Sequence, residues 1–422
     1  MLSTRRGFLV GGALSLVGWA AGTKSALGSV SVQTGRRPPN GDVLVSIFLR
    51  GGADGLSLVV PYADDDYYSN RPTINLPRPR DARAHPQDRV VDLDGFFGLH
   101  PSLAGLHPLF EAGHLAFVHA CGSGDQTRSH FEAMATVERG LYQETGPASG
   151  WLARHLQSAP WENRSPLRAV ALGAMVPATL SGATSATALN TVADLRLQVP
   201  FTGREAAITH SLNDLYNARD RRNLLTEAGH EALSVLKTLN HIDTDHYKPS
   251  NGAVYPKDDL GNGMKQVALL IKSEVGLEAA CLDHGSFDTH VAQGSLLPDK
   301  LKSLAGSLSA FAADLGAEQW RKTSIVVVSE FGRRVEENSG AGTDHGRGGV
   351  MMVLGGHAAG GRVHGHWPGL APSQLEGPGD LHVTTDYRNV LAEVIQRRLG
   401  NPNISDVFPG LVQQRVGVTR DA

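Results

Sequence analysis

Cysteine is nearly absent from this chain, which has two among 422 residues, Cys121 and Cys281. Two thiols cannot complete a structural zinc site of the four-cysteine kind, and they could form at most one disulfide. Each follows a short apolar run, a setting typical of a small buried hydrophobic side chain. An oxidising compartment would permit a bridge between them, but we expect two free thiols in the core.

Dense basic clusters and long apolar segments are also missing from the sequence. The formal net charge is -3, so electrostatics gives no reason to expect nucleic acid as a partner. Hydrophobic residues make up 41% of the chain, which is enough to build the large core of a globular protein. The composition therefore argues against a disordered, fibrous or nucleic-acid-binding chain.

The first 28 residues have the pattern of an export signal. Arg5 and Arg6 precede a Gly- and Ala-rich apolar segment that is shorter than the roughly 20 residues of a membrane-spanning helix. This is the twin-arginine pattern, and cleavage is expected after Gly28, with a retained signal anchor as the alternative. We therefore expect the twin-arginine translocase as a partner during export, and a periplasmic or cell-surface location. This route carries folded proteins, which suits a chain that acquires a metal before export.

Beyond a linker at 29–41, strand-like runs alternate with helical patterns. This alternation predicts an α/β fold, doubly wound, with a mostly parallel sheet and helices on both faces. We expect one domain over 42–422, with a helical insertion near 204–262. In such folds ligands bind beyond the carboxyl ends of the strands. Strands are expected at 42–50, 114–120, 167–173, 277–283, 323–330 and 349–356, and helices at 101–113, 129–140, 264–276, 299–317 and 386–400.

The first expected strand ends in "RGGADGLS", where Asp54 stands among glycines. Glycines allow a sharp turn and a close approach of the backbone to a ligand. The segment lacks the endings of a P-loop and of a dinucleotide-binding loop. Taken alone, Asp54 is typical of a turn residue, and its place at a strand end also makes it a candidate metal ligand.

The loop after the strand at 114–120 holds two hydroxyl groups that could act as a nucleophile, Thr127 and Ser129. Ser129 and Glu132 form an S-x-x-E capping box, which predicts that the Ser129 side chain caps a helix. A hydroxyl at a helix N-terminus is also well placed to attack an anion held there. The two roles are compatible, and Thr127 is a rival for the second.

Asp288 and His290 follow the strand at 277–283. They are two residues apart, so on an extended segment both side chains face the same way. A carboxylate and an imidazole aimed at one point are a fragment of a metal site. Asp283 and His284 form a competing pair.

Glu330 ends the strand at 323–330, and Asp344 and His345 precede the strand at 349–356. A lone acid or histidine at a strand end is ordinary. Several such ends with an acid, a hydroxyl or a histidine are less ordinary, because in a parallel sheet these ends meet at one edge. The sequence therefore predicts a metal site at this edge.

The segments "LRGGADGLSLVVP", "SHFEAM", "FDTH", "VVVSEFGRR" and "GTDHGRGGVMMVLGG", behind a twin-arginine signal, resemble the exported family called domain of unknown function 1501. That family belongs to the alkaline phosphatase and sulfatase superfamily, and the resemblance spans nearly the whole mature chain. It implies an alkaline-phosphatase-like fold and two neighbouring metal positions. Phe331 stands where superfamily members place a histidine ligand, so one ligand is missing. The resemblance implies the catalytic residues Ser129 or Thr127 and the metal ligands Asp54, Asp288, His290, Glu330, Asp344 and His345.

These implications predict an exported metal-dependent hydrolase of an anionic ester or polymer, with phosphate or sulfate esters as substrates. Three ligands from Asp288, His290 and His345 leave an open position, as in catalytic zinc sites. Asp54 and Glu330 could hold a harder cation such as magnesium, calcium or manganese.

Two arginines, Arg333 and Arg347, are candidates to clamp the oxygens of the substrate. The main alternative to an enzyme is a non-catalytic periplasmic or cell-surface binding protein with a degenerate metal site. A third is a structural role beside a co-exported surface protein.

Overall fold

The computed structural model describes residues 42–142, 146–195 and 246–420, with isolated positions between 210 and 244. The predicted signal peptide (1–28), the linker (29–41) and most of the predicted insertion near 204–262 lie outside the described residues. Within the described part of the chain, no helix is long and apolar enough to cross a membrane.

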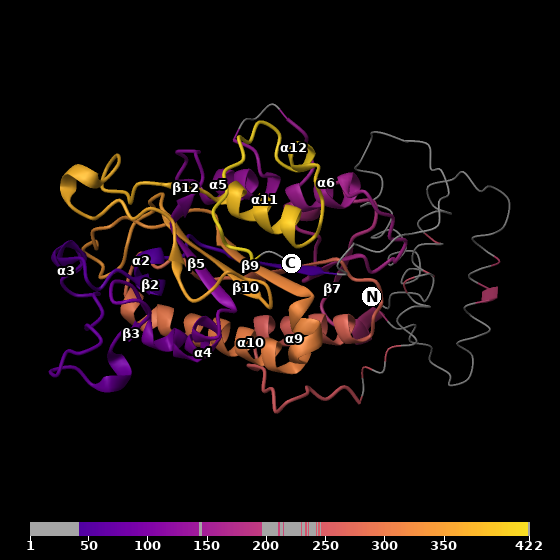
Figure 1. The fold of residues 1–422 in the computed structure, drawn as a ribbon, viewed down its shortest axis with the longest axis horizontal. Coiled ribbons are helices and arrows are strands. Elements are labelled where there is room, and N and C mark those ends of the chain that lie inside the picture. The colour runs from indigo at the N-terminus through magenta and orange to yellow at the C-terminus, as the bar shows by residue number, and fades with distance from the viewer. Residues whose placement is uncertain are drawn as a thin grey trace, which may run out of the picture.

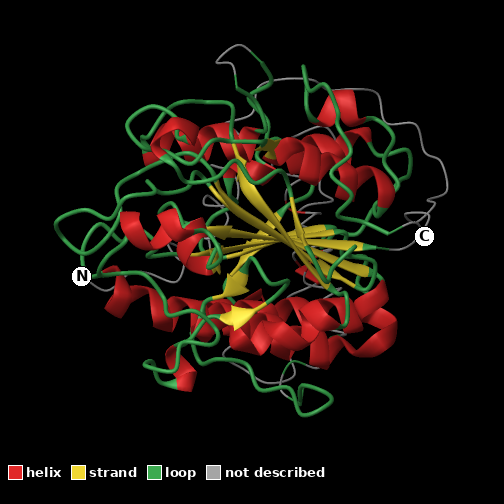
Figure 2. Ribbon diagram, turned by 60° about the vertical axis from the view of Figure 1, so that its left-hand side comes forward, coloured by secondary structure: helices red, strands yellow, loops and turns green. Residues whose placement is uncertain are grey.

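A large mixed sheet forms the centre of the protein (Figures 1 and 2). Among the described residues it has nine strands in the order β11-β5-β10-β9-β1-β8-β6-β7, and β12 pairs with β5. The pairs β1–β8, β1–β9, β6–β8, β6–β7, β5–β11 and β5–β12 are parallel. The strands are β1 (Val43–Leu49), β5 (Leu115–Gly122), β6 (Ala169–Leu172), β7 (Thr187–Leu189), β8 (Ala279–His284), β9 (Thr323–Ser329), β10 (Gly349–Gly355), β11 (Val363–His364) and β12 (Thr385–Asp386).

Helices cover both faces of this sheet, as Figure 2 shows. Every residue of β1 is buried, because its alternate side chains enter two different cores. Val45 and Ile47 pack in the core under α9, α10 and α4, whereas Leu44 and Phe48 pack in the core under α5, α6, α11 and α12. The helices are α4 (His107–Glu111), α5 (His130–Arg139), α6 (Trp151–Ser158), α9 (Asp259–Lys272), α10 (Gln293–Arg321), α11 (Tyr387–Arg397) and α12 (Ile404–Val407).

Smaller elements complete the domain. A three-stranded sheet pairs β4 with β2 and β3, and the helix expected at 101–113 begins as a 3-10 helix, η2, before α4. These elements are α2 (Gly55–Leu58), α3 (Asp65–Asn70), β2 (Val59–Val60), β3 (Val91–Asp92), β4 (Gly98–Leu99), η1 (Pro86–Asp88), η2 (Pro101–Leu106), η3 (Ala178–Leu180), η4 (Val192–Leu195) and η5 (Pro372–Gln374).

The predicted fold class, an α/β fold with a mostly parallel sheet and helices on both faces, is confirmed. Strand β10 is the exception, because it runs antiparallel to both β5 and β9. Its amino end therefore lies at the same edge as the carboxyl ends of β1, β5, β8 and β9. A parallel β10 would have carried His345, which precedes it, to the opposite edge.

The two cysteines are buried and free, as expected. Cys121 on β5 and Cys281 on β8 lie in the same core cluster. Burial raises the pKa of both thiols, so they stay protonated and behave as small hydrophobic side chains.

Candidate metal centre

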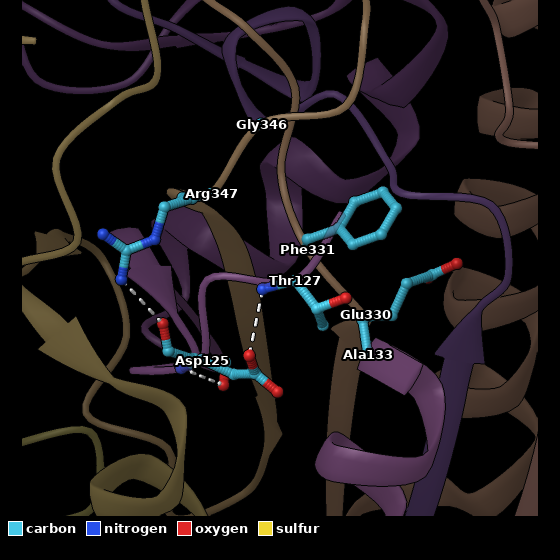
Figure 3. A pocket seen from close by; sticks show the side chains of 8 residues that line it. Asp125, Thr127, Ala133, Glu330, Phe331, Gly346 and Arg347 are labelled. Carbon is cyan, nitrogen blue, oxygen red and sulfur yellow. Dashed lines mark hydrogen bonds between the residues drawn. The ribbon is translucent and has the colours of Figure 1, made fainter. Parts of the chain in front are cut away.

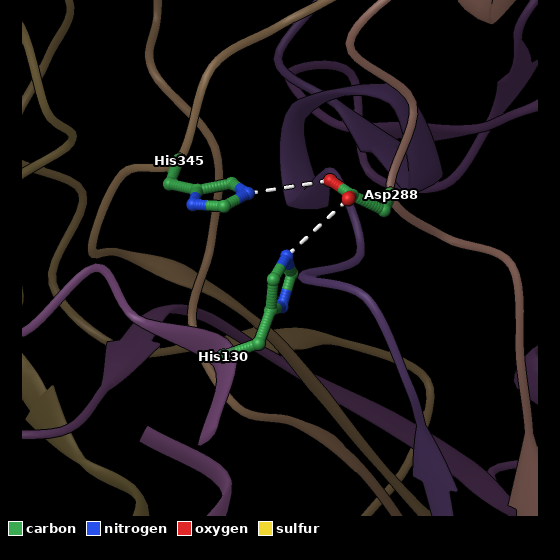
Figure 4. Close-up of side chains that lie close together, drawn as sticks. All are labelled: His130, Asp288 and His345. Carbon is green, nitrogen blue, oxygen red and sulfur yellow. Dashed lines mark hydrogen bonds and ion pairs between the residues drawn. The ribbon is translucent and has the colours of Figure 1, made fainter. Parts of the chain in front are cut away.

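Three imidazoles and one carboxylate converge at the shared edge of the sheet, and Figure 4 shows His130, His345 and Asp288 of this group. The Nε2 atoms of His290 and His345 are 2.9 Å apart, and they lie 3.1 and 3.2 Å from Asp288 Oδ1. His130 Nε2 approaches the other oxygen, Asp288 Oδ2, at 3.4 Å. Among the described residues, His130, Asp288 and His345 are the group whose ligand atoms all lie within 4.8 Å of one another.

These four side chains come from three different strand ends. His130 is the first residue of α5, which follows β5, and His345 lies in the loop before β10. Asp288 and His290 lie in the loop after β8. This loop approaches the end of β1 closely, because a Cβ at Gly51 would lie 2.5 Å from the Asp288 nitrogen. Gly51 has a φ of 115°, so glycine is required there both for space and for conformation.

Two of the three imidazoles are held from behind by carboxylates. His130 Nδ1 lies 2.9 Å from Glu330 Oε1, and His290 Nδ1 lies 3.1 Å from Asp344 Oδ1. An ionised carboxylate only accepts hydrogen bonds, so Nδ1 is the donor in each pair and Nε2 is the nitrogen that faces Asp288. Such an arrangement is usual for metal-ligating histidines, whose other ring nitrogen donates to an outer acceptor.

The third imidazole is oriented by the backbone. His345 Nδ1 donates to the carbonyl oxygen of Arg128 at 2.8 Å, so Nε2 again faces Asp288 and His290. Burial lowers the pKa of His345, against the bonds to Arg128 and Asp288 that raise it. A neutral imidazole is the form that binds a metal.

The Nε2 atoms of the three imidazoles are spaced as ligands of a cation would be. The Nε2 atoms of His290 and His345 are 2.9 Å apart, and in two neutral rings with protonated Nδ1 atoms they would turn lone pairs toward each other, which a proton or a metal cation between them would satisfy. His130 Nε2 is buried and has no hydrogen-bond partner. Nitrogen ligands about 2.0–2.1 Å from zinc lie roughly 3.3 Å apart in a tetrahedral site. The observed separations of 2.9 to 3.4 Å are close to that value.

The centre is open on one side. The side chains of His290 and Asp288 are 40% and 45% exposed, whereas those of His130 and His345 are 24% and 20% exposed. A substrate or water molecule can therefore reach the carboxylate and one imidazole from solvent.

Arg333 holds Asp288 in place. Its side chain is fully buried, and it donates to Asp288 Oδ1 at 2.6 Å and to the carbonyl oxygens of Gly52 and Thr343 at 2.6 and 2.8 Å. Burial alone would raise the pKa of Asp288, but Arg333, His345 and other partners lower it to about 2. Asp288 is thus ionised, and the donors of Arg333 are engaged within the protein rather than directed at a substrate.

The sequence matches, over residues 42–400, a family described as a protein of unknown function, DUF1501. The chain belongs to the DUF1501 family. No curated protein matches the sequence. Two solved structures that are similar to this DUF1501 protein are variants of TAB5 alkaline phosphatase with magnesium bound in a site named M3. Both are 11% identical and the alignments cover 75% of this chain and 91% of theirs, with TM-scores of 0.29 and 0.26.

In this DUF1501 protein, Glu330 supports the centre from behind. Its side chain is fully buried, and it accepts hydrogen bonds from Gly51 N at 2.8 Å, from Ser329 Oγ at 2.9 Å and from His130. With these donors around it, Glu330 is placed to orient His130. Asp344 has the same relation to His290 and also accepts from Asn338 Nδ2 at 3.0 Å.

Asp54 lies in a separate buried pair with Arg71. Arg71 Nη2 donates to Asp54 Oδ1 at 3.0 Å, and Ser57 Oγ and Gln293 Nε2 donate to Oδ2 at 2.6 and 2.7 Å. Burial would raise the pKa of Asp54, but Arg71 lowers it, so the carboxylate stays charged. The structure does not bring Asp54 to the converging imidazoles.

Ser129 occupies the N-cap position of α5, but its side chain makes no capping hydrogen bond. The predicted capping box is therefore wrong. Glu132 is instead paired with Thr127, whose hydroxyl donates to Glu132 Oε2 at 2.6 Å and accepts from the Ser129 backbone nitrogen at 3.2 Å. Thr127 thus reaches Glu132, five residues along the chain, from the segment that precedes α5.

A small, open pocket adjoins the centre (Figure 3). Thr127 and Arg347 line it, and Glu330 and Phe331 form the side nearest the imidazoles. Arg347 bonds Glu376 and the Ser123 carbonyl oxygen, but its Nε is buried without a partner. The other lining residues are Ser123, Asp125, Ala133 and Gly346.

Sequence reasoning missed His130. The neighbouring Ser129 drew attention as a hydroxyl, although a histidine at the first residue of a helix that follows a buried strand has the same placement as the other candidates. In the structure, Phe331 packs against His130 and His345: the centre of its ring lies 5.0 Å from that of His130 and 4.8 Å from that of His345. The position where a ligand was expected thus holds an apolar cover over two imidazoles.

Proposed function

We propose that this DUF1501 protein is a metal-dependent hydrolase of phosphate or sulfate esters. The observation that supports the proposal is the convergence of His130, His290, His345 and Asp288, in which each Nδ1 is bonded to an outer oxygen and each Nε2 faces Asp288. Three imidazole nitrogens and one carboxylate oxygen favour zinc or a similar transition metal over calcium or magnesium, which prefer oxygen ligands alone. A cation bound there would polarise an ester oxygen and offset the negative charge that develops on the transferring group.

The residues of the pocket supply a candidate nucleophile. Thr127 Oγ1 donates to Glu132 Oε2, so the carboxylate could take the hydroxyl proton as Thr127 attacks the substrate. Ser129 is the second candidate, at the start of the same helix as His130. Arg347 faces the pocket and could bind an oxygen of an anionic ester.

A second candidate function is an exported binding protein without turnover, which would hold an anionic polymer at the cell surface or partner a co-exported surface protein. Its support is Arg333, whose Nη1 lies 3.5 Å from His290 Nε2 and whose Nη2 contacts Asp288. A guanidinium this close competes with a metal cation for the same carboxylate. The apolar cover by Phe331 adds to this reading.

Export through the twin-arginine pathway is part of the proposal and rests on Arg5, Arg6 and the apolar segment that follows. Replacement of both arginines by lysine should leave the protein unprocessed in the cytoplasm. N-terminal sequencing of the exported wild type should begin at Ser29. A mature protein that retains residues 1–28 would instead support a signal anchor.

Metal content is the first test of the enzyme proposal. The folded protein, incubated with zinc, manganese, magnesium or calcium and then desalted, should retain about one equivalent of zinc or manganese, lost in Asp288→Ala and His345→Ala. The loaded protein should hydrolyse an aryl phosphate or aryl sulfate, and Thr127→Val or Ser129→Ala should abolish this. A loaded wild type that binds such anions without product release would favour the binding protein.

A further inference from the structure

One buried amide joins the two loops that carry most of the candidate ligands. Gln293 is the first residue of α10 and is 2% exposed. Its Oε1 accepts a hydrogen bond from Thr289 Oγ1 and another from Thr343 Oγ1, both at 2.8 Å. The two threonines are 1% and 0% exposed, so water does not compete for these bonds.

The threonines stand beside the ligands in the sequence. Thr289 separates Asp288 from His290, and Thr343 precedes Asp344 and His345. The loops also meet directly, because Thr343 N donates to the Thr289 carbonyl oxygen at 3.2 Å. Gln293 Oε1 therefore links the two loops at the residues next to the converging side chains, in addition to the direct backbone bond.

The orientation of that amide is set by a charge. Gln293 Nε2 donates to Asp54 Oδ2 at 2.7 Å, and Asp54 stays ionised because of its pair with Arg71. An ionised carboxylate cannot donate, so the NH2 group of Gln293 must face Asp54 and its oxygen must face the threonines. The buried pair at the end of β1 thus determines which end of Gln293 is an acceptor.

We infer that the chain Asp54–Gln293, with Thr289 and Thr343, positions the metal centre. This inference rests on the metal binding of the proposed function. Ligands must be held within about 0.5 Å of the productive geometry, which requires locked supporting residues. The hydroxyls of Thr289 and Thr343 are positioning groups, and their loss lets the loop with Asp288 and His290 move relative to the loop with His345.

The test replaces the hydroxyls without changing side-chain volume. Thr289→Val, Thr343→Val and the double variant each remove donors, whereas Thr289→Ser and Thr343→Ser keep them. Thr323→Val is the matched control, because Thr323 is 1% exposed, donates one hydrogen bond to the Gln319 carbonyl oxygen and lies at the amino end of β9. Three quantities are measured for each variant. The affinity for zinc and cobalt is obtained by competition with a chelating dye, the geometry of the site from the visible spectrum of bound cobalt, and the stability from the Tm of the metal-free protein.

The double valine variant should bind metal about 10- to 100-fold more weakly than the wild type, and its cobalt spectrum should change. The serine variants should bind within a few-fold of the wild type. The control should lose thermal stability with unchanged affinity and spectrum. If the double variant does not fold, each single valine variant is compared with its serine counterpart.

Equal affinities for the valine variants and the wild type would overturn the inference and leave the proposed function intact. A wild type that binds neither metal would overturn both. An affinity loss in Thr323→Val as large as that in the double variant would also count against positioning, because it would trace the effect to general stability.

Discussion

Replacement of Glu330 by glutamine tests whether Glu330 supports His130 or binds the metal directly. Glu330 Oε1 receives both the His130 and the Gly51 bonds, and Oε2 receives the bond from Ser329 Oγ. A glutamine with its oxygen at the Oε1 position keeps the first two bonds, and its NH2 can donate to Ser329, whose hydroxyl also has the Leu49 carbonyl oxygen to bond. The substitution therefore removes the negative charge of the side chain and keeps its size and its hydrogen bonds.

Loss of that charge should make His130 a poorer ligand, because a carboxylate raises the basicity of the imidazole more than an amide does. Outer carboxylates of this kind are typically worth 10- to 100-fold in metal affinity, which corresponds to about 1.4 to 2.8 kcal/mol. We expect Glu330→Gln to weaken zinc binding by that amount, with a Tm close to that of the wild type.

The assay is a competition titration of zinc with a chelating dye, beside thermal unfolding of the metal-free protein. Glu393→Gln is the control, since Glu393 lies on α11, is 2% exposed and accepts from the backbone nitrogens of Val416, Gly417 and Thr419. It should lose stability and keep its zinc affinity. Unchanged affinity in Glu330→Gln would refute a supporting role. A loss as complete as that of Asp288→Ala would make Glu330 a direct ligand, as the sequence predicted.

Further perturbations test the centre and its surroundings. His345→Ala removes a ligand and should weaken zinc binding by more than the roughly 100-fold limit of an outer carboxylate, measured by the same titration; a smaller loss would count against ligation. Arg71→Ala leaves the Asp54 charge buried and unpaired, so urea unfolding should show a loss of about 3–5 kcal/mol, whereas a loss under about 1 kcal/mol would contradict the buried pair. Burial lowers the pKa of His119 from 6.5 to about 4. Its neutral ring therefore contributes stability that is complete above pH 6.5 and is lost as the pH falls toward 4, by up to roughly 3 kcal/mol. His119→Gln should flatten that part of the curve of unfolding free energy against pH, and an unchanged curve would mean that His119 is not buried and neutral.

The hydrophobic pattern was sufficient to predict the main strands. The run at 42–50 became β1, whose residues are all buried, and the run at 323–330 became β9. A run of apolar residues carries no information on strand direction, however, and the reversal of β10 could not be read from its sequence. That reversal brings His345 to the edge where Asp288 and His290 lie.

The rule that ligands bind beyond the carboxyl ends of strands led to the loop with Asp288 and His290. The same rule could not place Asp54, because the partner that neutralises this acid, Arg71, follows it by 17 residues, beyond α2, β2 and α3. Only the folded chain shows that Asp54 is paired with a cation of the protein. The predicted helix at 299–317 also began too late, and Gln293 therefore went unnoticed.

Depth decides which acid of this edge is available to a metal. Asp288 and Glu330 both follow buried strands, yet their side chains are 45% and 0% exposed. The longer side chain of Glu330 turns inward, where the Gly51 nitrogen and the Ser329 hydroxyl satisfy its oxygens and leave one lone pair for His130. Asp288 Oδ2 lies 3.4 Å from the unpartnered Nε2 of His130, and its side chain is partly exposed to solvent. A cation from solvent would therefore meet Asp288 first, and Glu330 would act on it only through the imidazole between them.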